Sequence, residues 1–236
     1  MLGMNLGIKY YYRQRDNDEK LRELERQNLE HQLLHLRHQV NPHFLMNTLN
    51  NIHALIDIDA EKAQSAVVEL SRLMRYALYD AERQSVSIQK EVDFLGNFLA
   101  LMRIRLGDQV DICFDVPSPL PCAFVPPLLF ISFVENAFKH GISYLHPSFV
   151  HISFEIEDRR IVFNCINSHA EADTTTGVSD SKPSSAKTPE QTPGGLGLRN
   201  VRQRLDLLFP SDYQLDIQEN GATYAVRLDI PLKFTE

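Results

Sequence analysis

The spacing of the apolar residues changes at Gly107, and this change limits the kind of fold that the chain can adopt. Before Gly107, apolar residues recur at helical spacing and are separated by short polar connectors. After it, apolar and polar residues alternate over 110–116, which is typical of a strand. The sequence therefore predicts an α+β chain, with a helical part up to Leu106 and a sheet-containing part after it.

The helical part divides into a long helix and a set of shorter ones. Residues 16–40 contain neither glycine nor proline, and their leucines repeat at spacings of three and four with one break after Leu24. This pattern predicts a coiled coil between two copies of the chain, with a single solvated helix as the alternative. Helices are also expected from Pro42 to about Leu55, through 70–78, and from Gln89 to about Leu106. Short connectors between them indicate a helical dimerisation bundle.

The second part reads as an α/β sandwich. A helix is expected directly after Pro126-Pro127, and strands are expected at 150–156, 161–166, 214–218 and 224–230. Asn220-Gly221 is a strong hairpin-turn signal between the last two strands. Residues 170–193 are rich in Ser, Thr, Pro and Gly, which predicts a lid over a ligand or, alternatively, an inert linker.

Composition excludes several classes of protein. The 236 residues are 43% hydrophobic and 23% charged, as in ordinary globular proteins, and the net charge of -7 argues against nucleic-acid binding. The three cysteines lack metal-binding spacing and are interpreted as small apolar residues in a reducing compartment. The sequence contains no run of about 18 consecutive apolar residues, so it predicts no complete membrane span.

The N-terminus nevertheless indicates a membrane nearby. Residues 1–8 are weakly apolar and are followed by tyrosines, lysine and arginine over 9–15, which is typical of the cytoplasmic end of a membrane helix. We therefore expect the chain to be the cytoplasmic part of a longer membrane protein, with spans upstream. An ordinary basic N-terminus is the alternative.

One histidine stands in an unusual setting, within Asn-Pro-His-Phe-Leu-Met-Asn at 41–47. Proline is favoured in the first turn of a helix, so His43 is expected there, with Asn47 one turn later on the same face. A histidine held in this way can act as a nucleophile at neutral pH. Considered alone, it is more often a surface or capping residue.

Two further motifs carry chemistry for a phosphate ligand. Glu135-Asn136-Ala137-Phe138-Lys139-His140-Gly141 places a carboxylate, an amide, an ammonium and an imidazole near one helix end, a set that suits Mg²⁺ and a triphosphate. Gly-Gly-Leu-Gly-Leu-Arg-Asn at 194–200 is interpreted as a glycine-rich loop opening a helix, whose backbone N–H groups can hold phosphate. Each motif alone could be a simple helix cap or turn.

In this order the motifs resemble the cytoplasmic half of sensor histidine kinases of the LytS/YehU type. The resemblance covers residue 39 to the C-terminus and includes blocks at 70–76 and 91–105. The second half resembles the Bergerat-fold ATPase domain, with an N-box at 135–141 and a glycine box at 195–200. The domains implied are a membrane-proximal segment and signalling helix at 1–40, a dimerisation and phosphoacceptor region at 41–106, and an ATP-binding domain at 107–236 with a lid at 170–198.

The resemblance also implies roles for individual residues. His43 would accept the γ-phosphoryl group of ATP, Glu135 would act as its base or orienting group, and Asn136 would bind Mg²⁺. The remaining nucleotide-binding residues implied are Lys139, His140, Gly195, Gly197, Leu198 and Asn200. A homodimer would pass its phosphoryl group to an aspartate of a separate response regulator, on the cytoplasmic face of a bacterial membrane.

The sequence departs from the Bergerat pattern at one place. Where an Asp-x-Gly-x-Gly stretch normally binds adenine, the chain has Asn164-Cys165-Ile166-Asn167-Ser168-His169. Asn167 is expected to replace the aspartate, because its amide oxygen is also an acceptor. The departure keeps open the alternative of a non-catalytic ATP-binding scaffold. An ATPase without histidine transfer is a third possibility, which the motif at 41–47 disfavours.

Overall fold

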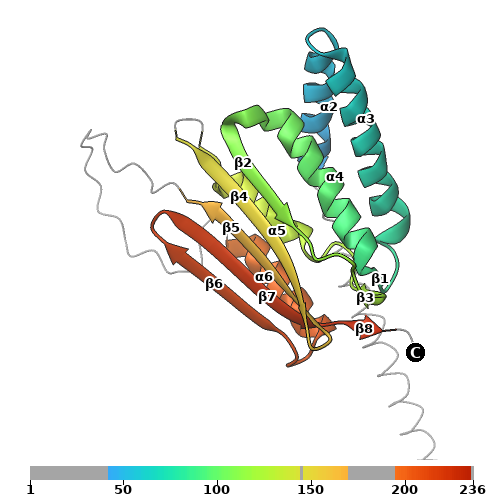
Figure 1. The fold of residues 1–236 in the computed structure, drawn as a ribbon, viewed down its shortest axis with the longest axis vertical. Helices are drawn as coiled ribbons and strands as arrows, with labels where there is room; N and C mark the ends of the chain where they lie inside the picture. The colour runs from blue at the N-terminus through green and yellow to red at the C-terminus, as the bar shows by residue number, and fades with distance from the viewer. Residues whose placement is uncertain (1–41, 144–145, 170–194, 235–236) are drawn as a thin grey trace, which may run out of the picture. The chain divides into compact units, whose positions relative to one another are not determined.

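The predicted helices and strands of the described residues follow one another in the expected order, with a few short strands added between them (Figure 1). The structure, a computed structural model, describes residues 42–143, 146–169 and 195–234, which belong to a unit that begins at Val40. The predicted membrane-proximal segment and coiled coil at 1–40 and the predicted lid at 170–193 lie outside the described residues. No helix in the described ranges is long and apolar enough to cross a membrane.

Between Pro42 and Leu106 the structure has three α-helices, α2 (Pro42–Ile56), α3 (Ala60–Arg75) and α4 (Ile88–Leu106). Asp59 caps α3 by accepting a 3.0 Å hydrogen bond from the Lys62 N–H, as expected for an acidic residue at a helix start. A single π-helical turn, Tyr76–Asp80, extends α3, and the two-residue strand β1 (Val86–Ser87) precedes α4. These positions confirm the three predicted helices.

A small antiparallel sheet joins distant parts of the chain. Its strand order is β1, β3 (Ala123–Val125), β8 (Lys233–Phe234), and Val86 pairs with Val125. The sequence did not predict β3 and β8, since strands of two or three residues are too short to show alternation. Because β1 pairs with β3, the residues on both sides of the predicted 106/107 boundary are tied together. That boundary stays a prediction.

The larger sheet is mixed. Its order is β2 (Val110–Asp115), β4 (Ser148–Glu157), β5 (Arg160–Ser168), β7 (Thr223–Pro231), β6 (Gln214–Asn220). Strand β2 pairs with β4 in parallel, and every other pair is antiparallel. Gly221 has a φ of 54° in the hairpin between β6 and β7, which confirms the predicted Asn-Gly turn.

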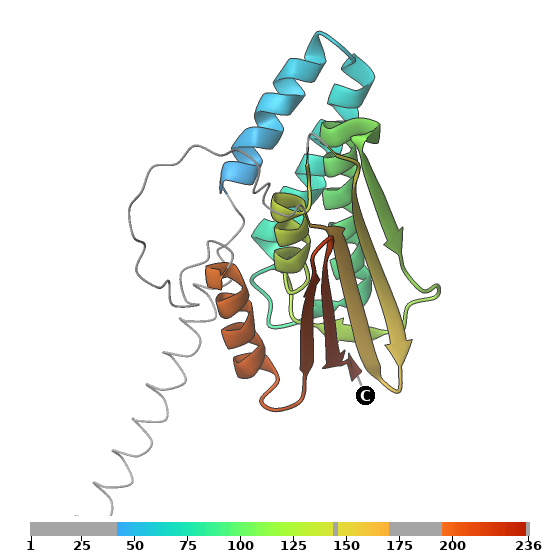
Figure 2. The same cartoon turned by 90° about the vertical axis from the view of Figure 1, so that its left-hand side faces the viewer.

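Two helices, α5 (Ile131–His140) and α6 (Gly195–Leu208), lie side by side on one face of the larger sheet (Figure 2). Aromatic rings fill the space beneath α5: Phe130 and Phe133 contact Phe163, and Phe130 also meets Phe154 edge to face. These rings are almost fully buried. The hydrophobic core extends from this layer to α2, α3 and α4.

Three expectations from the sequence were wrong in detail. Helix α5 begins at Ile131 rather than directly after Pro127, because Leu128 has a φ of 54° and interrupts helical geometry. Gly195 and Gly197 lie in the first turn of α6 rather than in a loop before it. Cys165 is buried as a small apolar residue, but Cys113 and Cys122 are exposed.

Candidate functional site

The predicted polar residues of the N-box all lie on the last two turns of α5. Glu135 and Asn136 are half-buried, whereas Lys139 and His140 are exposed. The opposite side of the helix is buried through Phe133, Val134, Ala137 and Phe138. The apolar side fixes the helix on the core, so the polar set projects from a rigid element as catalytic groups require.

Burial and neighbouring charges shift the titration of two of these residues. Loss of water around the carboxyl raises the pKa of Glu135 to about 7. Partial burial lowers the pKa of His140, and the nearby positive charges of Lys139 and His169 lower it further. Near neutral pH, Glu135 can therefore take up or release a proton, and His140 favours its neutral form, which can accept a hydrogen bond.

The end of α5 is packed tightly against β5. A Cβ atom added at Gly141 would lie 2.4 Å from Asn167 Nδ2 and 2.5 Å from the Ala137 carbonyl oxygen. Only glycine permits so close an approach. Ser168 Oγ donates a 2.5 Å hydrogen bond to the Gly141 carbonyl oxygen, which closes the junction. The structure therefore brings Asn167 next to the N-box, although Asn167 lies 26 positions after Gly141 in the sequence.

Asn167 is buried and presents an acceptor without a partner. Its Nδ2 donates to the Ser168 carbonyl oxygen at 2.7 Å, but its Oδ1 has no hydrogen-bond partner among the described residues. The hydroxyl of Tyr224 and the Nδ1 of His169 are in the same situation. A buried polar atom left unpaired costs about 1–3 kcal/mol, so three in one place indicate a site that a polar ligand completes.

Tyr224 and His169 were not predicted from the sequence. Tyr224 pairs with Asn167 in the antiparallel register of β5 and β7, and His169 directly follows β5. His169 Nε2 also contacts Glu219 Oε1 at 3.0 Å. The Asn-Gly hairpin fixes the register of β6 and β7, but the pairing of β7 with β5 depends on tertiary structure. Only that pairing identifies Tyr224 as a neighbour of the site.

The glycine box forms the start of α6. Gly195, Gly197, Leu198 and Asn200 all lie within its first two turns, and the Leu198 and Asn200 side chains are half-buried. Arg204, one turn further along, is buried and donates to the carbonyl oxygens of Pro127 and Leu128, the latter at 2.9 Å. The chain just before α5 therefore anchors α6 through the Arg204 side chain.

His43 is the second residue of α2, in its first turn as predicted. The adjacent Phe44 stacks on Phe98 of α4 with ring centroids 4.9 Å apart, and Phe98 meets Phe138 of α5 edge to face at 5.9 Å. Three rings thus connect the start of the His43 helix to the N-box helix. Each such pair contributes about 0.5–1.5 kcal/mol beyond the burial of its area.

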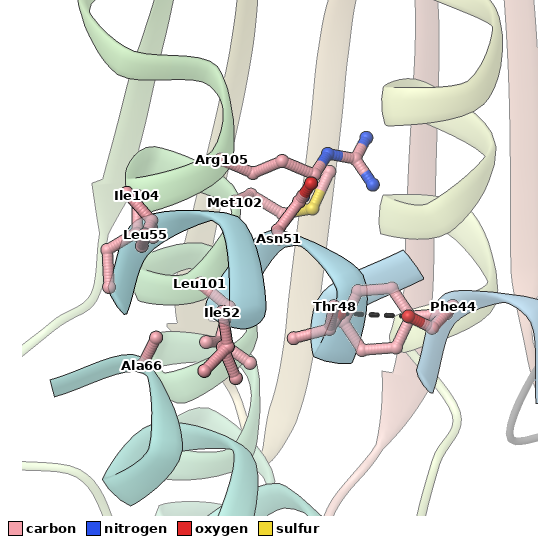
Figure 3. Close-up of a pocket in the computed structure, with 10 residues that line it drawn as sticks. All are labelled: Phe44, Thr48, Asn51, Ile52, Leu55, Ala66, Leu101, Met102, Ile104 and Arg105. Carbon is pink, nitrogen blue, oxygen red and sulfur yellow. Dashed lines mark hydrogen bonds between the residues drawn. The ribbon is translucent and has the colours of Figure 1, made fainter. Parts of the chain in front are cut away.

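A crevice between α2 and α4 lies beside this ring path (Figure 3). Apolar side chains make up most of its lining, together with Asn51 and Arg105, and Thr48 Oγ1 donates to the Phe44 carbonyl oxygen at 2.8 Å. None of the predicted nucleotide-binding residues lines it. The crevice is therefore a feature of helix packing rather than the candidate site.

Comparison with known proteins gives consistent relatives. Residues 31–110 match the family described as histidine kinase. The sensor protein LytS of Oceanobacillus iheyensis is 31% identical over 206 residues, which are 86% of this chain and 35% of the relative. The sensor histidine kinase YpdA of Escherichia coli is 30% identical over 192 residues, or 80% of this chain and 33% of the relative. The chain spans about a third of the length of these relatives.

Solved structures of similar chains are also known. The histidine kinase domain of a blue-light-activated histidine kinase from Erythrobacter litoralis is 18% identical with a TM-score of 0.46, and the match covers 87% of this chain and 96% of that one.

Proposed function

Because the chain belongs to the sensor histidine kinases of the LytS type, we propose that it transfers the γ-phosphoryl group of ATP to its own His43. The phosphoryl group would then pass to an aspartate of a separate response regulator. Catalysis of this kind depends on positioning and charge neutralisation more than on covalent help from the protein. The residues described above supply both.

The observation that carries this proposal is the path of three rings from Phe44 through Phe98 to Phe138. Phe44 follows His43 directly, and Phe138 precedes Lys139 and His140 on the N-box helix. The phosphoacceptor helix and the helix proposed to hold the phosphates therefore pack on the same ring of α4. A shift of either helix changes the packing of the other, as a signalling kinase requires.

The chemistry of the candidate site around Asn167 fits a purine nucleotide. The unpaired Oδ1 of Asn167 can accept a hydrogen bond from the exocyclic amine of adenine, the role proposed for it in place of aspartate. The amide oxygen of Asn136 is a suitable ligand for Mg²⁺. Lys139 and His140, with the first two turns of α6 from Gly195 to Asn200, would bind the phosphates.

In the proposed reaction, one imidazole nitrogen of His43 attacks the γ-phosphorus. An N–P bond forms, the bond to the bridging oxygen of ADP breaks, and the imidazole loses a proton. A pKa of about 7 allows Glu135 to receive that proton or to orient the ring. The ammonium group of Lys139 would offset charge on the phosphates.

The organisation of the whole protein is also part of the proposal. Residues 1–40 would form the membrane-proximal segment and signalling helix, 41–106 the dimerisation and phosphoacceptor region, and 107–236 the ATP-binding domain with its lid at 170–198. We propose a homodimer at the cytoplasmic face of the membrane, attached through spans upstream of this chain.

Incubation with γ-labelled ATP and Mg²⁺ tests the proposed activity. We expect label that is stable to base and labile to acid, and that is lost in His43→Gln. His53→Gln is the matched control, because His53 is an exposed histidine on the same helix and should be dispensable. Nucleotide binding without any label would favour the ATP-binding scaffold, and release of phosphate without labelled protein would favour an ATPase.

A further inference from the structure

Three side chains with metal-binding chemistry meet on the exposed face of the larger sheet. Asp111 and Cys113 lie two residues apart on β2, and His151 lies opposite Cys113 in the parallel register of β2 and β4. Side chains alternate along a strand, so all three project from the same face. The intervening Ile112 and its register partner Val150 are buried on the other face.

Their ligand atoms are already close together. Asp111 Oδ2 lies 3.0 Å from His151 Nε2, and Asp111 Oδ1 lies 3.8 Å from Cys113 Sγ. One ligand atom of each residue lies within 4.8 Å of the other two. Tetrahedral Zn²⁺, with bonds of about 2.0–2.3 Å, separates its ligands by about 3.3–3.8 Å. Small side-chain rotations would therefore bring all three atoms onto one ion.

We propose that Asp111, Cys113 and His151 bind a zinc ion or a similar late transition-metal dication. A thiolate, an imidazole and a carboxylate form a mixed set that suits such ions, whereas Mg²⁺ and Ca²⁺ prefer oxygen ligands alone. On binding, the Cys113 thiol gives up its proton and the ion replaces the contacts of Asp111 with His151 and Cys113. Three protein ligands leave one coordination position for water or for a partner's side chain.

The surroundings favour this site. The ring of Phe149 lies 4.8 Å from that of His151, centroid to centroid, and restricts its orientation. Strand β2 is an edge of the sheet, and both Asp111 and Cys113 are exposed, so an ion can enter from solvent. An ion in this position would link the edge strand to β4 in addition to the backbone hydrogen bonds.

The site lies on the opposite face of the sheet from the N-box helix. Phe133 of α5 packs on Phe163, whose register partner is Phe154. Phe154 is three residues from His151 on β4 and therefore points to the opposite face. The metal site can accordingly be tested independently of the proposed nucleotide site.

Titration of the purified chain with Co²⁺ tests the proposal, because a thiolate ligand gives Co²⁺ an intense charge-transfer absorption. We expect one equivalent of Co²⁺ to produce this band and Zn²⁺ to displace it, with Mg²⁺ leaving the spectrum unchanged. Cys113→Ser should abolish the band. His151→Ala should weaken binding by more than the 10–100-fold typical of losing an outer-shell partner.

Cys122→Ser is the matched control, since Cys122 is also exposed but lies outside the cluster. This variant should keep both the band and the affinity. Urea unfolding without added metal should give the same midpoint for Cys113→Ser and His151→Ala as for the wild type, which would show that both variants fold normally. Absence of the band in the wild type, or a band that survives Cys113→Ser, would overturn the proposal.

Discussion

Glu91 and Arg204 bind the same turn of the chain. Glu91 of α4 accepts hydrogen bonds from the Leu128 and Leu129 N–H groups at 3.1 and 3.0 Å, and Arg204 of α6 donates to the carbonyl oxygens of Pro127 and Leu128. All these polar contacts are buried. The turn that leads into the N-box helix is therefore held by two helices distant in the sequence.

Replacement of Glu91 should destabilise the protein strongly. Tyr76 also donates to Glu91 Oε2, so the carboxyl group accepts from three donors. Burial raises the pKa of both residues, and the carboxylate next to Tyr76 keeps its hydroxyl protonated. Tyr76→Phe should lower the free energy of unfolding by about 1.5–3 kcal/mol in urea titrations. Glu91→Gln should lower the free energy of unfolding at least as much. The amide N–H groups of the new glutamine would face the hydroxyl and backbone N–H donors that bind the Glu91 carboxyl group.

Asp93→Asn provides the comparison for these two variants. Asp93 is an exposed carboxylate on the same helix and should change stability by no more than about 0.5 kcal/mol. A Glu91→Gln protein as stable as Asp93→Asn would contradict the proposed importance of the buried contacts.

Glu91 and Arg204 should be energetically coupled, since Glu91 binds backbone N–H groups and Arg204 binds carbonyl oxygens of the same turn. A double-mutant cycle with Glu91→Gln and Arg204→Lys, measured by chemical unfolding, should give an interaction energy of about 0.5–3 kcal/mol. Lysine cannot reproduce the two-pronged contact of the guanidinium group. Arg202→Lys, at an exposed position of α6, should show additivity with Glu91→Gln. Additivity at Arg204 as well would show that the two contacts act separately.

Gly141→Ala should weaken nucleotide binding, because the new Cβ would overlap Asn167 Nδ2 and the Ala137 carbonyl oxygen. Fluorescent ATP-analogue titration should show at least about a tenfold loss of affinity, equivalent to about 1.4 kcal/mol. Gly96→Ala is the matched control, since its Cβ would meet Phe114 at an ordinary 3.8 Å. Within helix α4 it should instead stabilise by about 0.5–1 kcal/mol. Equal affinities for both variants would argue against a nucleotide pocket at this junction.

The stability of the protein should depend on the titration of Glu135. Its pKa is raised from the usual 4.5 to about 7 in the folded protein by burial. A raised carboxyl pKa means that the folded state binds more protons, so its contribution to stability is complete below about pH 4.5 and is lost as the pH rises through about 7. Glu135→Gln should remove this part of the pH dependence.

Urea unfolding at a series of pH values measures this contribution. Glu155→Gln, at an exposed position of β4, should retain the wild-type slope between about pH 4.5 and 7. If the Glu135→Gln variant also keeps the wild-type pH dependence, the Glu135 carboxyl group is not buried as described.

Sequence periodicity predicted the long elements well because their apolar faces are determined locally. The repeat of apolar residues in α4 and the alternation in β2 are complete within each segment. The start of α5 was predicted too early because its geometry depends on Glu91, which lies 37 residues before Leu128 in the sequence. No local pattern around Pro127 contains that contact.

The candidate site shows the same limit. The family resemblance implied that Asn167 takes the place of the adenine-binding aspartate, and this role stays a prediction. The structure shows that Asn167 packs against Gly141 at the end of the N-box. Tyr224 joins Asn167 only through strand register. The meeting of Cys113 with His151 likewise depends on parallel pairing across 38 residues of sequence, so cysteine spacing alone gave no sign of it.

Direct mapping of the phosphorylated residue tests the central claim most sharply. The chain would be incubated with ATP and Mg²⁺, digested at neutral or basic pH to preserve phosphohistidine, and fragmented by mass spectrometry. We predict that the phosphoryl group is on the His43 side chain, in the first turn of α2. A phosphoryl group on another residue, or none in a protein that binds ATP, would contradict the proposal that this chain is a histidine kinase acting through His43.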